Sequence, residues 1–119
     1  MPRVVGPVVP LLPIDIKLSA VTAQQFTYRM WWRDTASPTW SLLGEGAIVD
    51  TNPVTFQRPF TPGAQLYYWF AISGAPNAPY SWSLTFLHNE TIARNGLIQV
   101  SGSTNEQSAA VEQDWVNLV

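Results

Sequence analysis

Large apolar side chains recur at every second residue over long parts of this chain, and no other feature limits its fold more. Residues 65–73, with the sequence QLYYWFAIS, carry large apolar side chains at all four even positions. A β-strand points alternate side chains to opposite faces, so the segment predicts a strand with one face in a core. Tyr67 and Trp69 occupy odd positions and would stand on the second face. The question that follows is what covers that aromatic face.

The same period of two recurs at intervals of roughly ten residues, between segments rich in Gly, Pro and Asn. About seven or eight strands and no long helix predict an all-β fold, an antiparallel β-sandwich of immunoglobulin-like or jelly-roll type. The expected strands cover residues 14–18, 26–34, 39–49, 54–60, 65–73, 80–87 and 96–100. The expected core residues are Phe26, Tyr28, Met30, Leu66, Tyr68, Phe70, Trp82, Leu84 and Phe86.

The last segment, residues 109–119, is compatible with two kinds of secondary structure. Val111, Trp115 and Leu118 have the spacing of one helix face, and Ser108 could cap the start of a helix. The β-branched content and the all-β context favour a final strand instead. The sequence favours the strand without excluding the helix.

Residues 1–13 predict an extended, proline-rich arm that precedes a single domain covering residues 14–119. Pro7, Pro10 and Pro13 favour an extended backbone and remove amide donors. The arm is apolar, whereas a solvated linker is normally polar. We therefore expect it to dock on its own domain or on a neighbouring subunit. The side chains expected to dock are Val4, Val5, Val8, Val9, Leu11 and Leu12.

Composition excludes several classes of function. The chain has no cysteine, which rules out disulfides and thiolate metal sites. Charged residues make up 12% of the chain, its net charge is −2, and its basic residues are scattered, so we expect no binding to nucleic acid. No apolar run approaches the roughly 18 residues of a membrane-spanning helix, so we expect no membrane span.

Candidate catalytic groups are few. His88 is the only histidine, and it lies in an expected turn, where histidine usually has a solvated polar role. The acidic candidates are Glu45, Asp50, Glu112 and Asp114. They lie in turn-like or edge contexts, and nothing in the sequence brings two of them together, as glycoside hydrolysis would require. We therefore expect no enzymatic activity, no cofactor and no metal.

Four aromatic residues form the candidate interaction surface: Trp31, Trp40, Tyr67 and Trp69. Contiguous exposed aromatic residues mark an interaction site more often than single ones do. A neighbouring chain, the proline-rich arm or a sugar could cover this surface.

These observations favour a non-enzymatic structural protein that acts through protein–protein contacts. We expect a homo-oligomer or a partner of a shell protein, and the proposed setting is a virion surface component such as a capsid decoration or cement protein. One alternative is a carbohydrate-binding, lectin-like module that recognises glycans. A second alternative is a secreted, immunoglobulin-like adhesion or effector domain. A location on a virion surface or outside the cell is favoured over the cytoplasm.

Overall fold

The computed structural model of the chain describes residues 3–9, 12–21, 25–34, 37–48 and 53–119. Over these residues the fold is all-β, with nine strands in two sheets and no helix. The strands are β1 (Arg3–Val5), β2 (Pro13–Val21), β3 (Gln25–Arg33), β4 (Ser41–Ile48), β5 (Val54–Pro59), β6 (Gln65–Ser73), β7 (Pro79–His88), β8 (Thr91–Ser103) and β9 (Ala109–Leu118).

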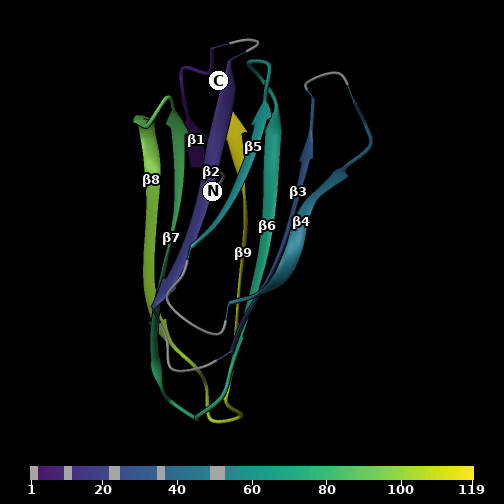
Figure 1. Cartoon of the computed structure of the whole chain (residues 1–119). Helices are drawn as coiled ribbons and strands as arrows, with labels where there is room; N and C mark the ends of the chain where they lie inside the picture. Colours follow the sequence, from purple (N-terminus) through teal and green to yellow (C-terminus); the bar gives the residue numbers. More distant parts are fainter. Residues whose placement is uncertain (1–2, 10–11, 22–24, 35–36, 49–52) are drawn as a thin grey trace.

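Two layers of strands enclose the core (Figure 1). One sheet has the strand order β1-β9-β6-β3-β4, and the other has the order β5-β2-β7-β8. Neighbouring strands in the described residues pair antiparallel, except that β1 runs parallel to β9. The expected count of seven or eight strands is therefore one or two too low, and the strand that was not expected is β1, which lies in the segment expected to be an arm.

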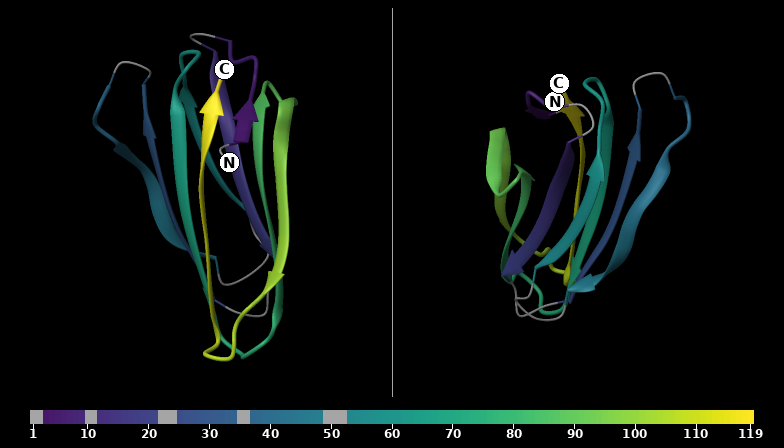
Figure 2. Two further views of the ribbon diagram at one scale, coloured as in Figure 1. Left: turned by 180° about the vertical axis from the view of Figure 1, so that it is seen from behind. Right: turned by 45° about the horizontal axis from the view of Figure 1, so that its top comes forward.

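The parallel pair forms because β1 and β9 end at the same point and share a network of backbone hydrogen bonds. Val119 N–H donates to the carbonyl of Val5 at 2.9 Å, and Val8 N–H donates to the carbonyl of Val119 at 2.7 Å. Figure 2 shows β1 beside the end of β9 when the molecule is seen from behind. The chain then crosses to the opposite sheet as β2.

The ambiguous last segment is a strand, as the sequence favoured. Residues of β9 pair along β6 from Ala109, opposite Ser73, to Asn117, opposite Gln65. Val116 and Leu118 are buried. Strand pairing satisfies the backbone groups of this segment and buries Val116 and Leu118 at the same time, which an isolated helix of this length would not do.

The buried residues confirm the alternation of inward and outward side chains that the sequence predicted. All nine residues expected in the core are buried. Phe70 lies at its centre, with ring centroids 5.2 Å from Phe26, 4.8 Å from Tyr68 and 4.9 Å from Trp82. These aromatic contacts join the two sheets, since Trp82 comes from β7 and the other three rings come from β3 and β6.

The hairpin between β7 and β8 is tight. Asn89 and Glu90 have φ angles of 47° and 66°, the left-handed conformation that two-residue hairpin turns require. Residues 93–96, whose asparagine and glycine are typical of a turn, lie inside β8. There the pairing register with β7 shifts between Thr85 and Leu87, and Asn95 has a φ of 59°. Residues 93–96 thus stand opposite the single residue Phe86, and the asparagine and glycine interrupt the strand pairing without ending the strand.

Two leucines give a matched test of this sandwich. Leu84 is 0% exposed and Leu97 is 52% exposed. Leu84→Ala should lower the free energy of unfolding by about 2–5 kcal/mol, because it leaves a cavity in the core. Leu97→Ala removes the same atoms from the surface and should change it by less than about 1 kcal/mol. Urea unfolding of both variants checks this, and equal losses would mean that the faces of β7 and β8 are assigned wrongly.

Candidate functional site

The outer face of the five-stranded sheet carries a row of aromatic rings. Trp31 on β3 lies opposite Tyr67 on β6, which in turn lies opposite Trp115 on β9. The ring centroid of Tyr67 is 5.6 Å from that of Trp31 and 6.5 Å from that of Trp115. Trp40, from the residue before β4, adds a fourth ring with its centroid 6.2 Å from that of Tyr67. The register of three strands therefore builds one contiguous aromatic cluster.

These four rings line a hollow of about 400 Å³ on the surface of the sheet. We call it the aromatic hollow. Trp115 is 44% exposed, and the other three side chains are half-buried. Leu42, which lies opposite Trp31 on β4, is exposed and extends the apolar surface toward the edge strand. The hollow can therefore take up an apolar group of another molecule.

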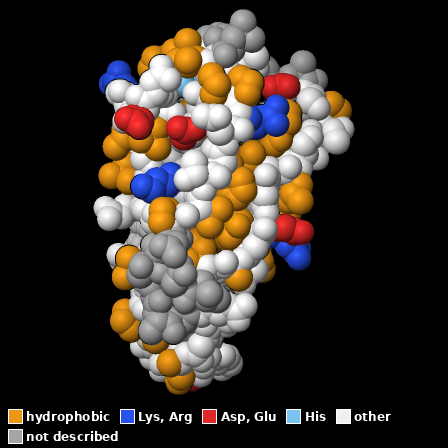
Figure 3. Space-filling model, in the orientation of Figure 1, with side chains coloured by type: hydrophobic (Ala, Val, Ile, Leu, Met, Phe, Trp, Pro, Cys, Tyr) orange, Lys and Arg blue, Asp and Glu red, His pale blue; other side chains and the backbone are white. Residues whose placement is uncertain are grey.

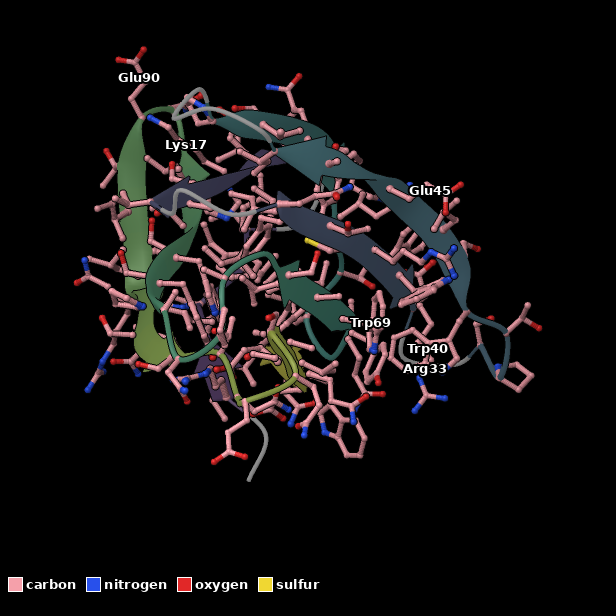
Figure 4. All side chains as sticks on the ribbon, turned by 90° about the horizontal axis from the view of Figure 1, so that it is seen from below. Lys17, Arg33, Trp40, Glu45, Trp69 and Glu90 are labelled. Atoms are coloured by element: carbon pink, nitrogen blue, oxygen red, sulfur yellow. The ribbon has the colours of Figure 1, made fainter. Side chains whose placement is uncertain are left out.

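A ladder of polar side chains borders one side of the hollow. The Nε–H of Arg33 donates to Oε1 of Gln65 at 2.8 Å, and Nε2–H of Gln65 donates to Oδ1 of Asn117 at 2.8 Å. The guanidinium carbon of Arg33 lies 4.5 Å from the centre of the Trp40 ring. This cation–π contact and the hydrogen bonds hold Trp40 and Arg33 in place before any ligand arrives. Figure 4 shows these two side chains on the same side of the molecule.

The opposite side of the hollow is also polar. The hydroxyl of Tyr67 donates to Oε1 of Gln113 at 2.7 Å. Arg29 and Glu45 form an exposed ion pair at 3.4 Å between Nε and Oε2. Trp69 is half-buried on this face, between Arg29 and Gln113 in the pairing register. An apolar centre with a polar border is the usual organisation of a protein-binding surface.

The outer face of the other sheet has a different chemistry. Its strands alternate the buried residues mostly with small or polar ones, apart from exposed Val21 and Leu97, and it carries no comparable ring cluster among the described residues. The outward positions include Lys17, Ser19, Thr55, Gln57, Ser81, Ser83, Thr85, Gln99 and Ser101. Figure 3 shows charged side chains to be few and scattered on the side of the molecule that faces the viewer. Serine, threonine and glutamine hydrate this face, so the two sheets differ in what their outer surfaces can do.

Sequence reasoning named most of this surface. Trp31, Trp40 and Tyr67 line the hollow, and Trp69 lies on the same face without lining it. Sequence reasoning missed Trp115, because its direction depends on whether residues 109–119 are a strand. The alternation of outward Val111 and Trp115 with inward Val116 was the signal that could have identified it.

The apolar side chains of the amino-terminal segment divide between core and surface. Val5 and Val8 are buried in the core of their own domain. Leu12 is half-buried, and Val4 and Val9 are exposed. Leu11 lies outside the described residues.

His88 contacts the backbone of this same segment. Its Nδ1 lies 3.1 Å from the carbonyl oxygen of Pro13, and Val9 N–H donates to its Nε2 at 3.4 Å. The histidine therefore joins the end of β7 to the amino-terminal segment on both sides of its ring.

Two of the candidate carboxylates share the inward side of β9. Glu112 and Asp114 alternate in the same phase as buried Val116 and are both half-buried. The hydroxyl of Tyr80 donates to Oε1 of Glu112 at 2.7 Å. Burial and this carboxylate raise the pKa of Tyr80 to about 12. Asp50, a further candidate, lies outside the described residues.

Within the described residues, no three acidic, histidine or cysteine side chains are grouped so that they could hold a metal ion. The same residues contain no helix long and apolar enough to cross a membrane. No protein-family model, no curated protein and no solved structure matches the chain.

The polar ladder beside the hollow can be tested at its centre. Gln65→Leu removes both hydrogen bonds of Gln65 and leaves Arg33 and Asn117 without it, so it should lower the free energy of unfolding by about 1–3 kcal/mol. Gln113→Leu removes one exposed bond and should lower it by less than about 1 kcal/mol. Chemical unfolding gives the energies, and near-ultraviolet circular dichroism should change more in Gln65→Leu. Identical behaviour of both variants would argue against a preorganised ladder.

The buried hydroxyl of Tyr80 predicts a loss of stability in alkali. Free tyrosine has a pKa of about 10, so between pH ~10 and ~12 the unfolded chain releases a proton that folded Tyr80 keeps. Stability from this residue is complete below pH ~10 and falls by up to about 3 kcal/mol as the pH rises to ~12. Burial also raises the pKa of Tyr28 and Tyr68, which adds to the loss. Tyr80→Phe should show a shallower decline in urea unfolding over this range, and an unchanged slope would contradict the assignment.

Proposed function

We propose that this protein is a non-enzymatic assembly protein that binds another protein surface through the outer face of its five-stranded sheet. One observation carries the proposal: Trp31, Trp40, Tyr67 and Trp115 surround a hollow of about 400 Å³ on an otherwise solvent-facing sheet. Tryptophan and tyrosine dominate the binding energy of protein interfaces when a partner removes them from water. The neighbouring hydrogen bonds fix the rings in advance, which lowers the entropy lost on binding.

We infer further that the sandwich is a jelly roll in which the two chain ends fall between the second and third strands of the usual strand count. The strands pair as nested couples, β3 with β4, β2 with β5, β9 with β6 and β8 with β7. If the strands are counted in the order β8, β9 and then β2 to β7, the first strand pairs with the last, the second with the one before the last, and so on inward. This is the pairing of a long hairpin rolled into two sheets, which is the jelly-roll arrangement. An immunoglobulin-like order fits less well, because its last two strands are neighbours in one sheet, whereas β8 and β9 lie in different sheets.

Jelly rolls occur in viral capsid proteins and in lectins. By analogy of fold, a virion surface component, such as a capsid decoration or cement protein, is therefore our proposed setting. The low charge of the chain supports this setting, since charged residues are depleted at the centre of protein contacts.

A lectin-like module is the second candidate, and one observation favours it. Arg33 and Gln113 beside the rings retain N–H donors that a sugar hydroxyl could use. The geometry of the rings favours a protein partner instead. Their planes are tilted by 40° to 62° and their centroids lie 5.6 to 6.5 Å apart, so they form a cluster and not a flat platform for a pyranose ring.

Replacement of Trp115 distinguishes these functions. The parent protein should have a solution mass above the 13.2 kDa of one chain, because copies bind through the hollow. Trp115→Ser should weaken this association by about tenfold or more and leave the far-ultraviolet circular dichroism unchanged. Light scattering during size-exclusion chromatography measures the mass. Leu97→Ser, which changes an exposed apolar residue on the other sheet, serves as the control.

A glycan array on the same proteins decides the alternative. A monomeric parent that binds glycans, and loses them in Trp115→Ser, would replace the assembly function with a lectin function. A parent that stays monomeric and binds no glycan would exclude both self-association through the hollow and the lectin function.

A further inference from the structure

Arg33 places a positive charge at the border of the aromatic hollow. Its Nε–H is bonded to Gln65, but among the described residues no carboxylate forms an ion pair with its guanidinium. The guanidinium carbon lies only 4.5 Å from the centre of the Trp40 ring that lines the hollow. An occupant that fills the hollow with an apolar side chain and brings a carboxylate beside it would satisfy both features.

The tip of the β7–β8 hairpin of this same chain has that chemistry. Glu90 is exposed in the turn, and Ile92, two residues later, is 51% exposed at the start of β8. The left-handed Asn89 and Glu90 make this two-residue turn narrow, so the tip is a small element.

The two groups lie close together in the sequence, so one hairpin tip presents both. Only Thr91 separates Glu90 in the turn from Ile92 at the start of β8. The long side chains of Glu90 and Arg33 can bring carboxylate and guanidinium together while an apolar group lies against the Trp40 ring, whose centre is 4.5 Å from the guanidinium carbon. Ile92 can therefore enter the hollow while the carboxylate of Glu90 reaches Arg33.

Other exposed apolar residues match the hollow less well. Val4 and Leu97 line a groove together with Arg3, and Val4 and Val119 line another together with Arg94. Either groove would bring a second cation toward Arg33, and like charges at a contact oppose binding. The acidic hairpin tip instead combines an exposed apolar side chain with an exposed carboxylate.

We propose that the β7–β8 hairpin tip of one copy occupies the aromatic hollow of the next copy, with Ile92 among the rings and Glu90 paired with Arg33. This rests on the proposed function and names the partner as a second copy of the chain. Figure 4 shows Glu90 at the opposite side of the molecule from Arg33 and Trp40. A copy cannot fill its own hollow, so the contact is head-to-tail and propagates into a ring or a filament.

Charge reversal tests the ion pair. Glu90→Lys and Arg33→Glu should each weaken self-association by about tenfold or more, because like charges then meet at the contact. An equimolar mixture of the two variants should associate again, since each tip now finds a hollow of opposite charge. Sedimentation velocity over a range of concentrations measures association. Glu106→Lys, an exposed change in the loop before β9, is the control and should associate as the parent does.

Apolar replacement tests the head-to-tail geometry. Ile92→Ser has an intact hollow and a disabled tip, whereas Trp115→Ser has an intact tip and a disabled hollow. Each alone should be monomeric, and their mixture should form a pair of two chains and nothing larger. Circular dichroism shows whether each variant is folded, and Arg33→Gln replaces Arg33→Glu if the latter unfolds.

The outcomes separate this inference from the proposed function. If Trp115→Ser dissociates the parent while Ile92→Ser and Glu90→Lys do not, the hollow binds a different segment and the inference is overturned, although the proposed function stands. If the mixtures do not associate, the contact is not head-to-tail. If the parent is monomeric at the highest concentrations reached, the inference is wrong.

Discussion

The pairing of β6 with β3 on one side and β9 on the other is the constraint on which the molecule depends. This pairing sets Phe70 and Tyr68 in the core and places Tyr67 and Trp69 outside. Because side chains alternate, a slip of one residue would exchange the two faces and bury the polar groups of the outer face. The cluster of Phe26, Phe70 and Trp82 rings opposes such a slip, since it has no equivalent in the shifted register.

The same strand register is sufficient to bring together the residues of the candidate site. Once Trp31, Tyr67 and Trp115 lie on neighbouring strands, their side chains stand one strand spacing apart and must touch. The next outward row holds Arg33, Gln65 and Asn117, whose side chains then reach one another as a hydrogen-bonded ladder. Core packing thus determines both the apolar centre and its polar border, and the stability of the sandwich is what keeps the site preformed.

The sequence predicted the parts of this arrangement that depend on local alternation. The nine core residues and the outward direction of Trp31 and Tyr67 follow from a period of two within single strands. It did not predict β1 or the direction of Trp115, because both depend on pairing between the two ends of the chain. The strand order in the two sheets could not be predicted from the sequence either, because no local pattern shows which of several similar strands become neighbours.

Low charge and an aromatic face together create a problem of specificity. A chain with 12% charged residues has little repulsion to keep copies apart, and an uncovered cluster of rings binds apolar surfaces with little selectivity. Arg33 at the border of the hollow changes this, because the rings around it lower the local polarity once a partner excludes water. A segment that brings Arg3 or Arg94 would then place two cations together, whereas one that brings a carboxylate gains an attraction that water no longer screens. The single cation Arg33 beside the four rings therefore makes this apolar surface selective for segments that carry a carboxylate.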